Sequence, residues 1–203
     1  MPAIGITGGI STGKSTFCQC LRDILPDARY FDADEVARQL VDLEEVKREL
    51  LAQFGSGIFA RNGDLNREAL RAIVFRDAAK RRALEQILHP RIRRQWSALA
   101  ETHRDSTEFF FADIPLLYET DGQKLCDRVV VVACSREIQL ARLMNKKAIG
   151  RDEAEQMMNV QMPLEEKIRR ADHVVWNNGE HAVLEEQAQL LAALWGSQKW
   201  TKA

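Results

Sequence analysis

Short runs of apolar residues alternate along this chain with longer segments in which apolar residues recur every three or four positions. This pattern predicts five β-strands joined by α-helices. The strands are expected at residues 4–6, 27–31, 108–112, 128–133 and 173–176. The fourth of them is apolar after its first residue, as in strands that are covered on both faces. Because strands that alternate with helices form parallel sheets, a three-layer α/β fold with a parallel five-stranded sheet is predicted.

Helical periodicity dominates the region between the second and third predicted strands. Apolar positions predict helix over residues 34–54, 67–75 and 78–88, and a further helix from Pro90 to about residue 101. Asn66 is expected to cap the helix that follows it, and Pro90 suits the first turn of a helix. This region is therefore expected to be a helical insertion between two strands of the sheet.

The segment Gly8-Gly9-Ile10-Ser11-Thr12-Gly13-Lys14-Ser15 follows the first predicted strand and precedes a helical pattern. It fits the spacing G-x-x-x-x-G-K-[ST] of a phosphate-binding loop, whose backbone N–H groups surround a phosphate. Lys14 would place a positive charge on the β- and γ-phosphates of a nucleotide, and the Ser15 hydroxyl would bind Mg²⁺. The strand and helix on either side distinguish this match from a glycine-rich turn that contains lysine by chance. The sequence therefore predicts a site for nucleotide phosphates.

Polar residues gather where the second, third and fifth predicted strands end. These residues are Asp32 and Asp34, Asp113, and Asn177 with Asn178. Ligands bind at the carboxyl edge of open α/β sheets. One of Asp32 and Asp34 is expected to accept a proton from a hydroxyl group or to hold the metal through water. The alternative is an N-cap for the next helix, which Asp34 fits too. Asp113 is either an acid that binds Mg²⁺ or a residue that simply ends its strand.

A polar, helical stretch between residues 142 and 170 carries several cations, among them Arg142, Lys146, Lys147, Arg151 and Arg169. Such a segment can close over a nucleotide and neutralise charge on the transferred phosphoryl group. The alternative is a solvated helix face, which is the usual position of charged residues. Arg142 is the strongest candidate for a functional role.

Composition restricts the partners of the protein. The 203 residues carry a formal net charge of −1, so no overall positive field would attract nucleic acid or a membrane surface. The chain has no run of ~20 apolar residues, which a membrane span needs, and no signal peptide is expected. Its four cysteines lack the spacing of zinc ligands, so reduced thiols are expected. We expect a cytoplasmic protein that is a monomer or a weak homo-oligomer.

The motifs of the chain, taken in order, resemble those of the dephospho-CoA kinases. Beyond the loop they are Asp32-Ala33-Asp34 with Arg38, His89-Pro90, Pro115-Leu116-Leu117-Tyr118-Glu119, Gln139 with Arg142, Gln161 and Asn177-Asn178-Gly179. This ordered combination covers nearly the whole chain and is far more specific than the loop alone. The resemblance implies the last step of CoA synthesis, in which ATP phosphorylates the ribose 3′-hydroxyl group of dephospho-CoA to give CoA and ADP.

The resemblance also implies the architecture. The family is similar to the nucleoside-monophosphate kinases, which have the P-loop nucleoside-triphosphate hydrolase fold. One domain is expected, made of a core (residues 1–34, 108–140 and 171–203), a helical substrate-binding insertion (35–107) and a mobile lid (141–170).

The resemblance assigns roles to individual residues. The ATP-binding residues would be Ser11, Thr12, Gly13, Lys14, Ser15 and Thr16 at the phosphates, with Asn177 and Asn178 near the adenine. Asp34 would be the base for the 3′-hydroxyl group, and Lys14 and Arg142 would join it in catalysis, with Arg142 in the lid. The residues that would bind dephospho-CoA are Asp32, Asp34, Arg38, His89, Pro115, Leu116 and Glu119.

Three features depart from the family pattern, and one of them is the loop after Leu40, which is shorter than usual and lacks the family's Pro-Gly. Ser11-Thr12 stands where the family usually has Gly-Ser. If Ser11 requires a positive φ it costs about 1 kcal/mol relative to glycine, and the alternative is an ordinary conformation. Lys146 occupies a lid position that is commonly arginine, so a bidentate phosphate contact there would become a point charge.

Two other functions are open to a chain with this loop. Another small-molecule or nucleoside-monophosphate kinase would share the loop and the lid, but it has no reason to carry the downstream motifs. A non-catalytic nucleotide switch of the GTPase type would need Asn-Lys-x-Asp at the end of a strand. The Asn145-Lys146 pair lies inside a predicted helix and has no such aspartate, which disfavours the switch.

Overall fold

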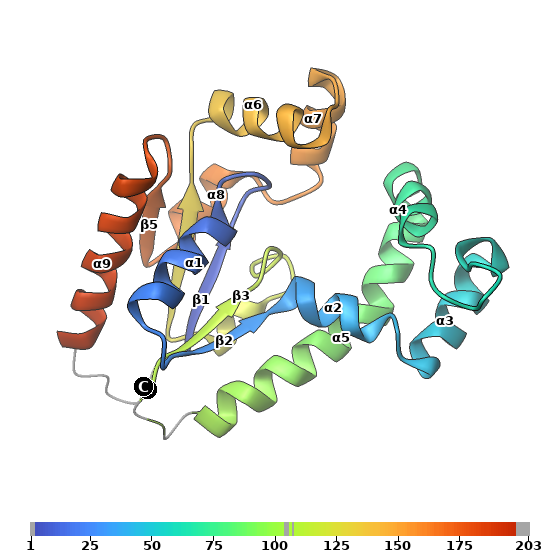
Figure 1. Ribbon diagram of the computed structural model, residues 1–203, viewed down its shortest axis with the longest axis horizontal. Coiled ribbons are helices and arrows are strands. Elements are labelled where there is room, and N and C mark those ends of the chain that lie inside the picture. Colours follow the sequence, from blue (N-terminus) through green and yellow to red (C-terminus); the bar gives the residue numbers. More distant parts are fainter. Residues whose placement is uncertain (1–2, 104–105, 107, 198–203) are drawn as a thin grey trace. The chain divides into compact units, whose positions relative to one another are not determined.

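The computed structural model describes residues 3–103, 106 and 108–197. Within these residues, five parallel strands form one sheet in the order β2-β3-β1-β4-β5 (Figure 1). The strands are β1 (Ala3–Gly8), β2 (Arg29–Asp32), β3 (Phe110–Asp113), β4 (Arg128–Ala133) and β5 (His173–Trp176). β1 lies at the centre, paired with β3 on one side and β4 on the other. The predicted α/β fold with its parallel five-stranded sheet is confirmed.

Helices follow every strand. They are α1 (Lys14–Ile24), α2 (Ala33–Leu40), α3 (Glu44–Phe54), α4 (Arg67–Arg76), α5 (Ala78–His103), α6 (Arg136–Lys147), α7 (Arg151–Asn159), α8 (Leu164–Arg170) and α9 (His181–Ser197), with short 3-10 helices η1 (Ser56–Ile58) and η2 (Gly122–Leu125). None of the helices in the described ranges combines the length and the hydropathy that crossing a membrane would require.

The chain divides into two compact units. The first comprises Met1–Phe31 and Leu99–Ala203 and holds most of the sheet, and the second is Asp32–Ala98. The limits expected for the core and the insertion at residues 1, 107 and 203 lie outside the described residues.

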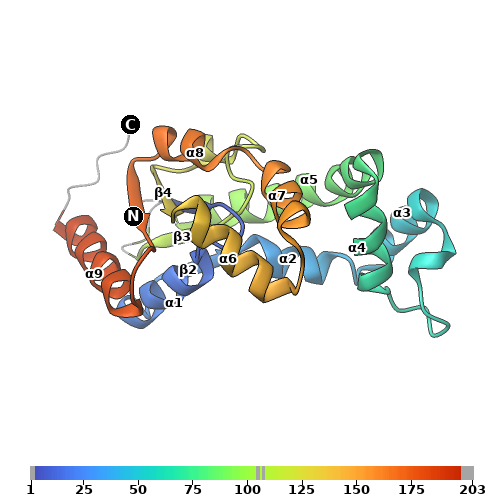
Figure 2. The same ribbon diagram turned by 90° about the horizontal axis from the view of Figure 1, so that it is seen from above.

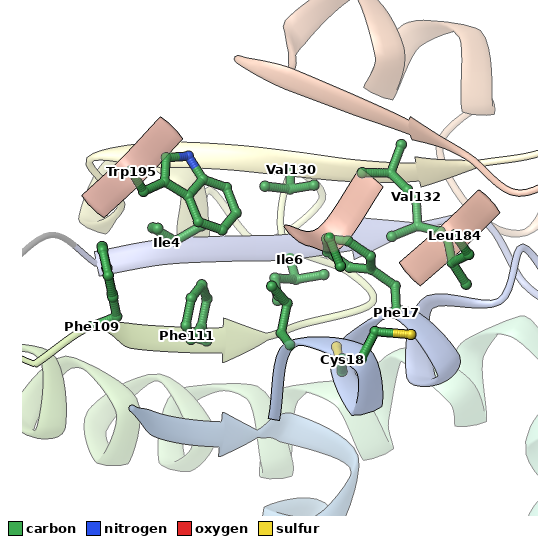
Figure 3. Packing of buried hydrophobic residues seen from close by; sticks show 14 residues of the cluster. Ile4, Ile6, Phe17, Cys18, Phe109, Phe111, Val130, Val132, Leu184 and Trp195 are labelled. Carbon is green, nitrogen blue, oxygen red and sulfur yellow. The ribbon is translucent and has the colours of Figure 1, made fainter. Parts of the chain in front are cut away.

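The main core of the first unit lies on the face of the sheet that α1 and α9 cover, and α8 lies on the opposite face (Figure 2). Ile4 and Ile6 of β1 point to the α1 and α9 side because alternate residues of a strand share a face. Figure 3 shows them beside Val130, Val132 and the aromatic side chains. The rings of Phe111 and Trp195 pack with their centroids 5.8 Å apart. This packing fixes β1, and with it the start of the phosphate-binding loop.

The second unit has a hydrophobic core of its own. It is formed by buried residues of α2 to α5, of η1 and of the turn after α2, namely Leu40, Val41, Val46, Leu50, Ile58, Leu70, Ile87 and Leu88. The Asn66 side chain caps α4 by accepting the N–H of Ala69 at 3.0 Å, as predicted.

The helix expected at residues 34–54 is two helices, α2 and α3. The chain turns between Val41 and Leu43, and the side chain of Arg67 stabilises this turn. The Arg67 guanidinium donates to the Arg38 carbonyl at 3.0 Å and to the Asp42 carboxylate at 2.9 Å. Since carbonyls in the last turn of a helix have no intrahelical partner, a donor from α4 allows α2 to end there. The apolar periodicity continues across the turn, so the sequence alone does not show this end.

In contrast, the two helices expected before and after Pro90 are one helix, because α5 continues through this proline. Proline removes one backbone donor from a helix but has a helical φ. Close to it, the Arg91 side chain donates to the Ile87 carbonyl at 2.7 Å. Ile87 and Ile92, on either side of the proline, both pack into the second core, and this packing holds the two halves of the helix in line.

Leu184 and Leu190 of α9 provide a matched test of the first core. Their exposed fractions are 2% and 71%. We expect Leu184→Ala to lower the free energy of unfolding by about 2–5 kcal/mol, because it leaves a cavity beside the sheet. Leu190→Ala should change it by less than about 0.5 kcal/mol. Urea unfolding of both variants measures the difference, and equal losses would contradict the assignment of this core.

Candidate active site

The loop between β1 and α1 requires glycine at position 13. Gly13 is the N-cap of α1 and has a φ of 93°. The side-chain amide of Asn177 donates to the Thr12 carbonyl at 2.9 Å. The amide nitrogen lies so close to Gly13 that a Cβ at this position would overlap the nitrogen. Because α1 begins at Lys14, its first N–H groups have no partner within the helix and are available to an anion. The predicted strand–loop–helix context of a phosphate site is therefore present.

Ser11 has a φ of 59°, in the region that favours glycine. This confirms the first of the two expectations for Ser11, and the strain amounts to about 1 kcal/mol relative to glycine. The residue is half-buried, so the surrounding contacts of the loop hold it in this conformation.

Lys14 and Asp113 form an ion pair at the carboxyl edge of the sheet. Their side chains are 13% and 10% exposed. The Cys18 thiol donates to the other carboxylate oxygen of Asp113 at 3.4 Å, and burial raises the pKa of Cys18, so the thiol stays protonated as a donor. The structure thus brings together two of the residues predicted from separate strand ends, and Lys14 has a counter-charge within reach.

Arg142 reaches the same loop from α6. One of its terminal nitrogens, Nη1, lies 3.9 Å from the point that a Cβ on Gly13 would occupy. This nitrogen is buried and has no hydrogen-bond partner in the part of the chain that the structure describes. Burial raises the pKa of the nearby Cys134 thiol, while the positive charge of Arg142 and a hydrogen bond from it act in the opposite direction. A half-buried guanidinium with one buried, unsatisfied nitrogen beside a phosphate-binding loop can bind an anionic ligand.

The other cations of this stretch lie at the surface. Lys146 and Lys147 are exposed in the last turn of α6. Arg151 pairs with Glu155 at 3.1 Å within α7, and Arg169 pairs with Glu166 within α8. Their positions match the alternative of a solvated helix face, and among the five candidates the structure brings Arg142 to the loop.

The two asparagines after β5 bind main-chain groups. Asn177 is 8% exposed and holds the Thr12 carbonyl, as described above. Asn178 accepts the N–H of Ser135 at 2.7 Å, and Ser135 in turn caps α6. The asparagines therefore connect the end of β5 with the loop and with the helix that carries Arg142. Their expected place near the adenine stays a prediction.

Lys167 of α8 is a buried cation that belongs to none of the motifs in the sequence. Its side chain is fully buried, and its ammonium group forms an ion pair with Glu119 at 2.9 Å. The same group donates to the carbonyl oxygens of Gly8 at 3.2 Å and Pro115 at 2.9 Å. Glu119 also accepts the N–H of Met162 at 3.0 Å. Burial lowers the pKa of Lys167, while the Glu119 carboxylate opposes that shift.

A sequence signal for Lys167 does exist. Leu164, Lys167 and Ile168 recur at the three- and four-residue spacing of one helix face, so the lysine shares the apolar side of α8. A lysine on such a face is either buried with a partner or extends to solvent, and only the fold shows that Glu119 and two carbonyls meet it.

The remaining predicted residues divide between the two units. Pro115, Leu116 and Glu119 belong to the first unit, and Asp32, Asp34, Arg38 and His89 belong to the second. Asp32 is the residue that caps α2, since its carboxylate accepts the N–H of Glu35 at 2.9 Å. The helix cap expected at this pair of aspartates is therefore present, at Asp32 and not at Asp34, which lies exposed in the first turn of α2.

Arg38 and His89 have different environments within the second unit. Arg38 forms an exposed ion pair with Glu35 at 2.7 Å, and the hydrogen bonds from Arg38 and Gln39 lower the pKa of Glu35. His89 is half-buried in α5, and burial lowers its pKa. A neutral imidazole is therefore favoured at His89 near neutral pH.

Removal of the Lys167 charge tests the buried ion pair. We expect Lys167→Met to lower the free energy of unfolding by about 3 kcal/mol, because Glu119 and two carbonyls lose their donor. Lys167→Met combined with Glu119→Gln should recover part of this loss, since no carboxylate then lacks its counter-charge. Lys124→Met, at an exposed pair with Asp121, is the control and should have little effect. Urea unfolding compares the four proteins, and a double variant no more stable than Lys167→Met would contradict this account.

Comparisons with known proteins agree with the motifs. A sequence model of the dephospho-CoA kinase family matches residues 2–182. The curated dephospho-CoA kinase of Geobacillus kaustophilus is 42% identical over 194 residues, which cover 94% of each chain.

Two solved structures share the fold. TT1252 from Thermus thermophilus aligns with a TM-score of 0.78 and 32% identity over 98% of each chain. The dephospho-CoA kinase from Campylobacter jejuni aligns with a TM-score of 0.70 at 23% identity, covering 94% of this chain and 95% of its own. Since the match to the family spans most of its length, the chain belongs to the dephospho-CoA kinase family and is a kinase with the P-loop kinase fold.

Proposed function

We propose that the protein transfers the γ-phosphoryl group of ATP to the 3′-hydroxyl group of the ribose of dephospho-CoA, which gives CoA and ADP. The observation that carries the proposal is the convergence of Lys14 and the Arg142 guanidinium on one phosphate-binding loop. An unpaired buried donor such as Arg142 Nη1 is costly, and a phosphate oxygen would satisfy it. Membership of a kinase family supports ATP as the phosphoryl donor.

The transfer is proposed to depend on position and charge. The N–H groups of residues 11–16 would bind the phosphates, and Lys14 would exchange its contact with Asp113 for the β- and γ-phosphate oxygens. Arg142 would stabilise the negative charge of the transferred group in the transition state. Asn177, which orders the loop through Thr12, and Asn178 would lie near the adenine.

Ser15 and Asp113 are proposed to hold Mg²⁺, directly or through water. Ser15 is exposed near the start of α1, and Asp113 ends β3 beside Lys14. Hydroxyl and carboxylate oxygens are the ligands that Mg²⁺ prefers, and phosphates usually complete its coordination. When bound, the metal neutralises charge on the β- and γ-phosphates.

Asp34 is proposed to be the base that accepts the proton of the 3′-hydroxyl group. Its neighbour Asp32 already accepts the Glu35 N–H as the cap of α2, which gives Asp32 a structural role. Asp34 is exposed and follows β2 by two residues, and β2 belongs to the same sheet as the strand that precedes the loop. The carboxyl ends of parallel strands lie at the same edge, which supports a position of Asp34 near the acceptor.

The proposed substrate site draws on the helical insertion as well. Arg38, His89, Pro115, Leu116 and Glu119 are proposed to border dephospho-CoA, together with Asp32. The separate contacts and core of Asp32–Ala98 support an insertion that is distinct from the core. Residues 141–170 are proposed to form the lid. Within this segment, Lys167 of α8 contacts Gly8, Pro115 and Glu119, and Met162 contacts Glu119.

The function is tested by measuring ADP release with Mg·ATP and a panel of acceptors. The panel contains dephospho-CoA, AMP, CMP, adenosine and shikimate, and Lys14→Ala serves as the variant without the phosphate contact. Turnover confined to dephospho-CoA supports the proposal. Turnover only with a nucleoside monophosphate or shikimate would overturn the proposed substrate, and no turnover with any acceptor would overturn the proposed reaction.

The two carboxylates at the end of β2 can be ranked with matched substitutions. Asp34→Asn should lower kcat by ~100-fold or more, because the amide cannot accept the hydroxyl proton. Asp32→Asn should keep most of the activity and the stability, since asparagine caps helices as well as aspartate does. Steady-state turnover with dephospho-CoA compares them, and a large loss in Asp32→Asn with normal rates in Asp34→Asn would reverse the assignment.

A further inference from the structure

The peptide groups of Ile10, in the middle of the phosphate-binding loop, are held by two glutamines. The side-chain amide of Gln139 donates to the Ile10 carbonyl at 2.7 Å, and the side-chain carbonyl of Gln161 accepts the Ile10 N–H at 3.0 Å. Gln139 lies in α6, and Gln161 lies between α7 and α8. A donor and an acceptor, from two segments more than a hundred residues away, therefore fix both polar groups of one loop residue.

The loop is shaped to admit this contact. Gln139 is 4% exposed and lies directly against Gly9, where a Cβ would come within 2.5 Å of its amide nitrogen. The second glycine of the loop is thus explained by the close approach of Gln139. Any larger residue at position 9 would displace the glutamine from Ile10.

The same glutamines connect the loop with the groups proposed to act on phosphate. Arg142 follows Gln139 by three residues in α6, so the two side chains share a face of the helix. Gln161 precedes Met162, whose N–H binds Glu119 in the buried pair with Lys167. The two contacts therefore fix both ends of the α6–α7 segment relative to the loop.

We propose that Gln139 and Gln161 are positioning residues, which clamp Ile10 and so set the position of Arg142 over the phosphate-binding loop. The inference rests on the proposed role of Arg142 in phosphoryl transfer. Positional errors of about 1 Å can cost ~100-fold in rate, so a flexible hold on the loop is expected to lower turnover. Neither glutamine needs to touch a substrate for this effect.

Glutamate substitutions distinguish the clamp from simple packing, because glutamate has the size and shape of glutamine. At position 161 a carboxylate still accepts the Ile10 N–H, so Gln161→Glu should keep the contact. At position 139 an ionised carboxylate faces the Ile10 carbonyl and cannot donate, so Gln139→Glu should break the contact. Packing alone would give both substitutions similar effects.

Two measurements follow the clamp independently. With saturating ATP, Gln139→Ala, Gln139→Glu and Gln161→Ala should each lower kcat by about tenfold with little change in KM for dephospho-CoA, while Gln161→Glu retains most of kcat. Hydrogen exchange of the Ile10 amide, followed by NMR in the protein without nucleotide, should be faster in Gln161→Ala and protected in Gln161→Glu. Gln19→Ala, at an exposed glutamine of α1 that pairs with Asp23, is the matched control.

Three outcomes would overturn the inference. The first is a wild-type kcat in folded Gln161→Ala. This variant can be measured even if substitutions at the buried position 139 prevent folding. The second is an equal loss in Gln161→Glu and Gln139→Glu. The third concerns the double variant Gln139→Ala/Arg142→Ala. If its fold-loss in kcat equals the product of the two single fold-losses, the residues act independently, whereas residues that act through one another are not additive. Normal turnover in Arg142→Ala alone would instead reject the proposed role of Arg142, so the two failures are distinguishable.

Discussion

The phosphate-binding loop depends on hydrogen-bond donors for its own carbonyl groups. A loop whose N–H groups face a phosphate turns carbonyl groups outward, and each buried carbonyl without a donor costs about 1–3 kcal/mol. Three of the donors come from distant parts of the chain: Lys167 binds Gly8, Gln139 binds Ile10 and Asn177 binds Thr12. The Thr12 hydroxyl, within the loop itself, binds Gly9. The loop conformation, including the strained Ser11, is therefore a property of the whole first unit rather than of the motif itself.

The need of the loop carbonyls for hydrogen-bond donors explains how the elements of the first unit are arranged around β1. The central strand is fixed by packing against α1 and α9, and the loop that follows it receives contacts from α6, from α8 and from the end of β5. The ion pair of Lys167 with Glu119 joins α8 to the segment after β3 at the same place. The groups proposed to bind phosphate and the groups that order the loop are therefore connected by one set of contacts.

The second unit contributes in another way. It has its own core and begins at Asp32, the cap of α2, so the carboxylate proposed as the base stands in the first turn of a helix with a defined start. The residues proposed to meet the acceptor come from both units, since Arg38 and His89 belong to the second and Pro115, Leu116 and Glu119 belong to the first. Asp32 and Asp34 are two positions apart in sequence, yet their local roles differ.

The sequence by itself determined the strand order along the chain, the phosphate-binding loop and the family, because apolar periodicity and motif spacing are local properties of a chain. It also located Asp113 and Arg142, which the fold brings to the loop. It did not determine the end of α2, the passage of α5 through Pro90 or the burial of Lys167. Those features, and the contacts of Gln139 and Gln161 with Ile10, are decided by donors and acceptors that lie far apart in sequence. Only the tertiary structure brings such partners within hydrogen-bonding distance.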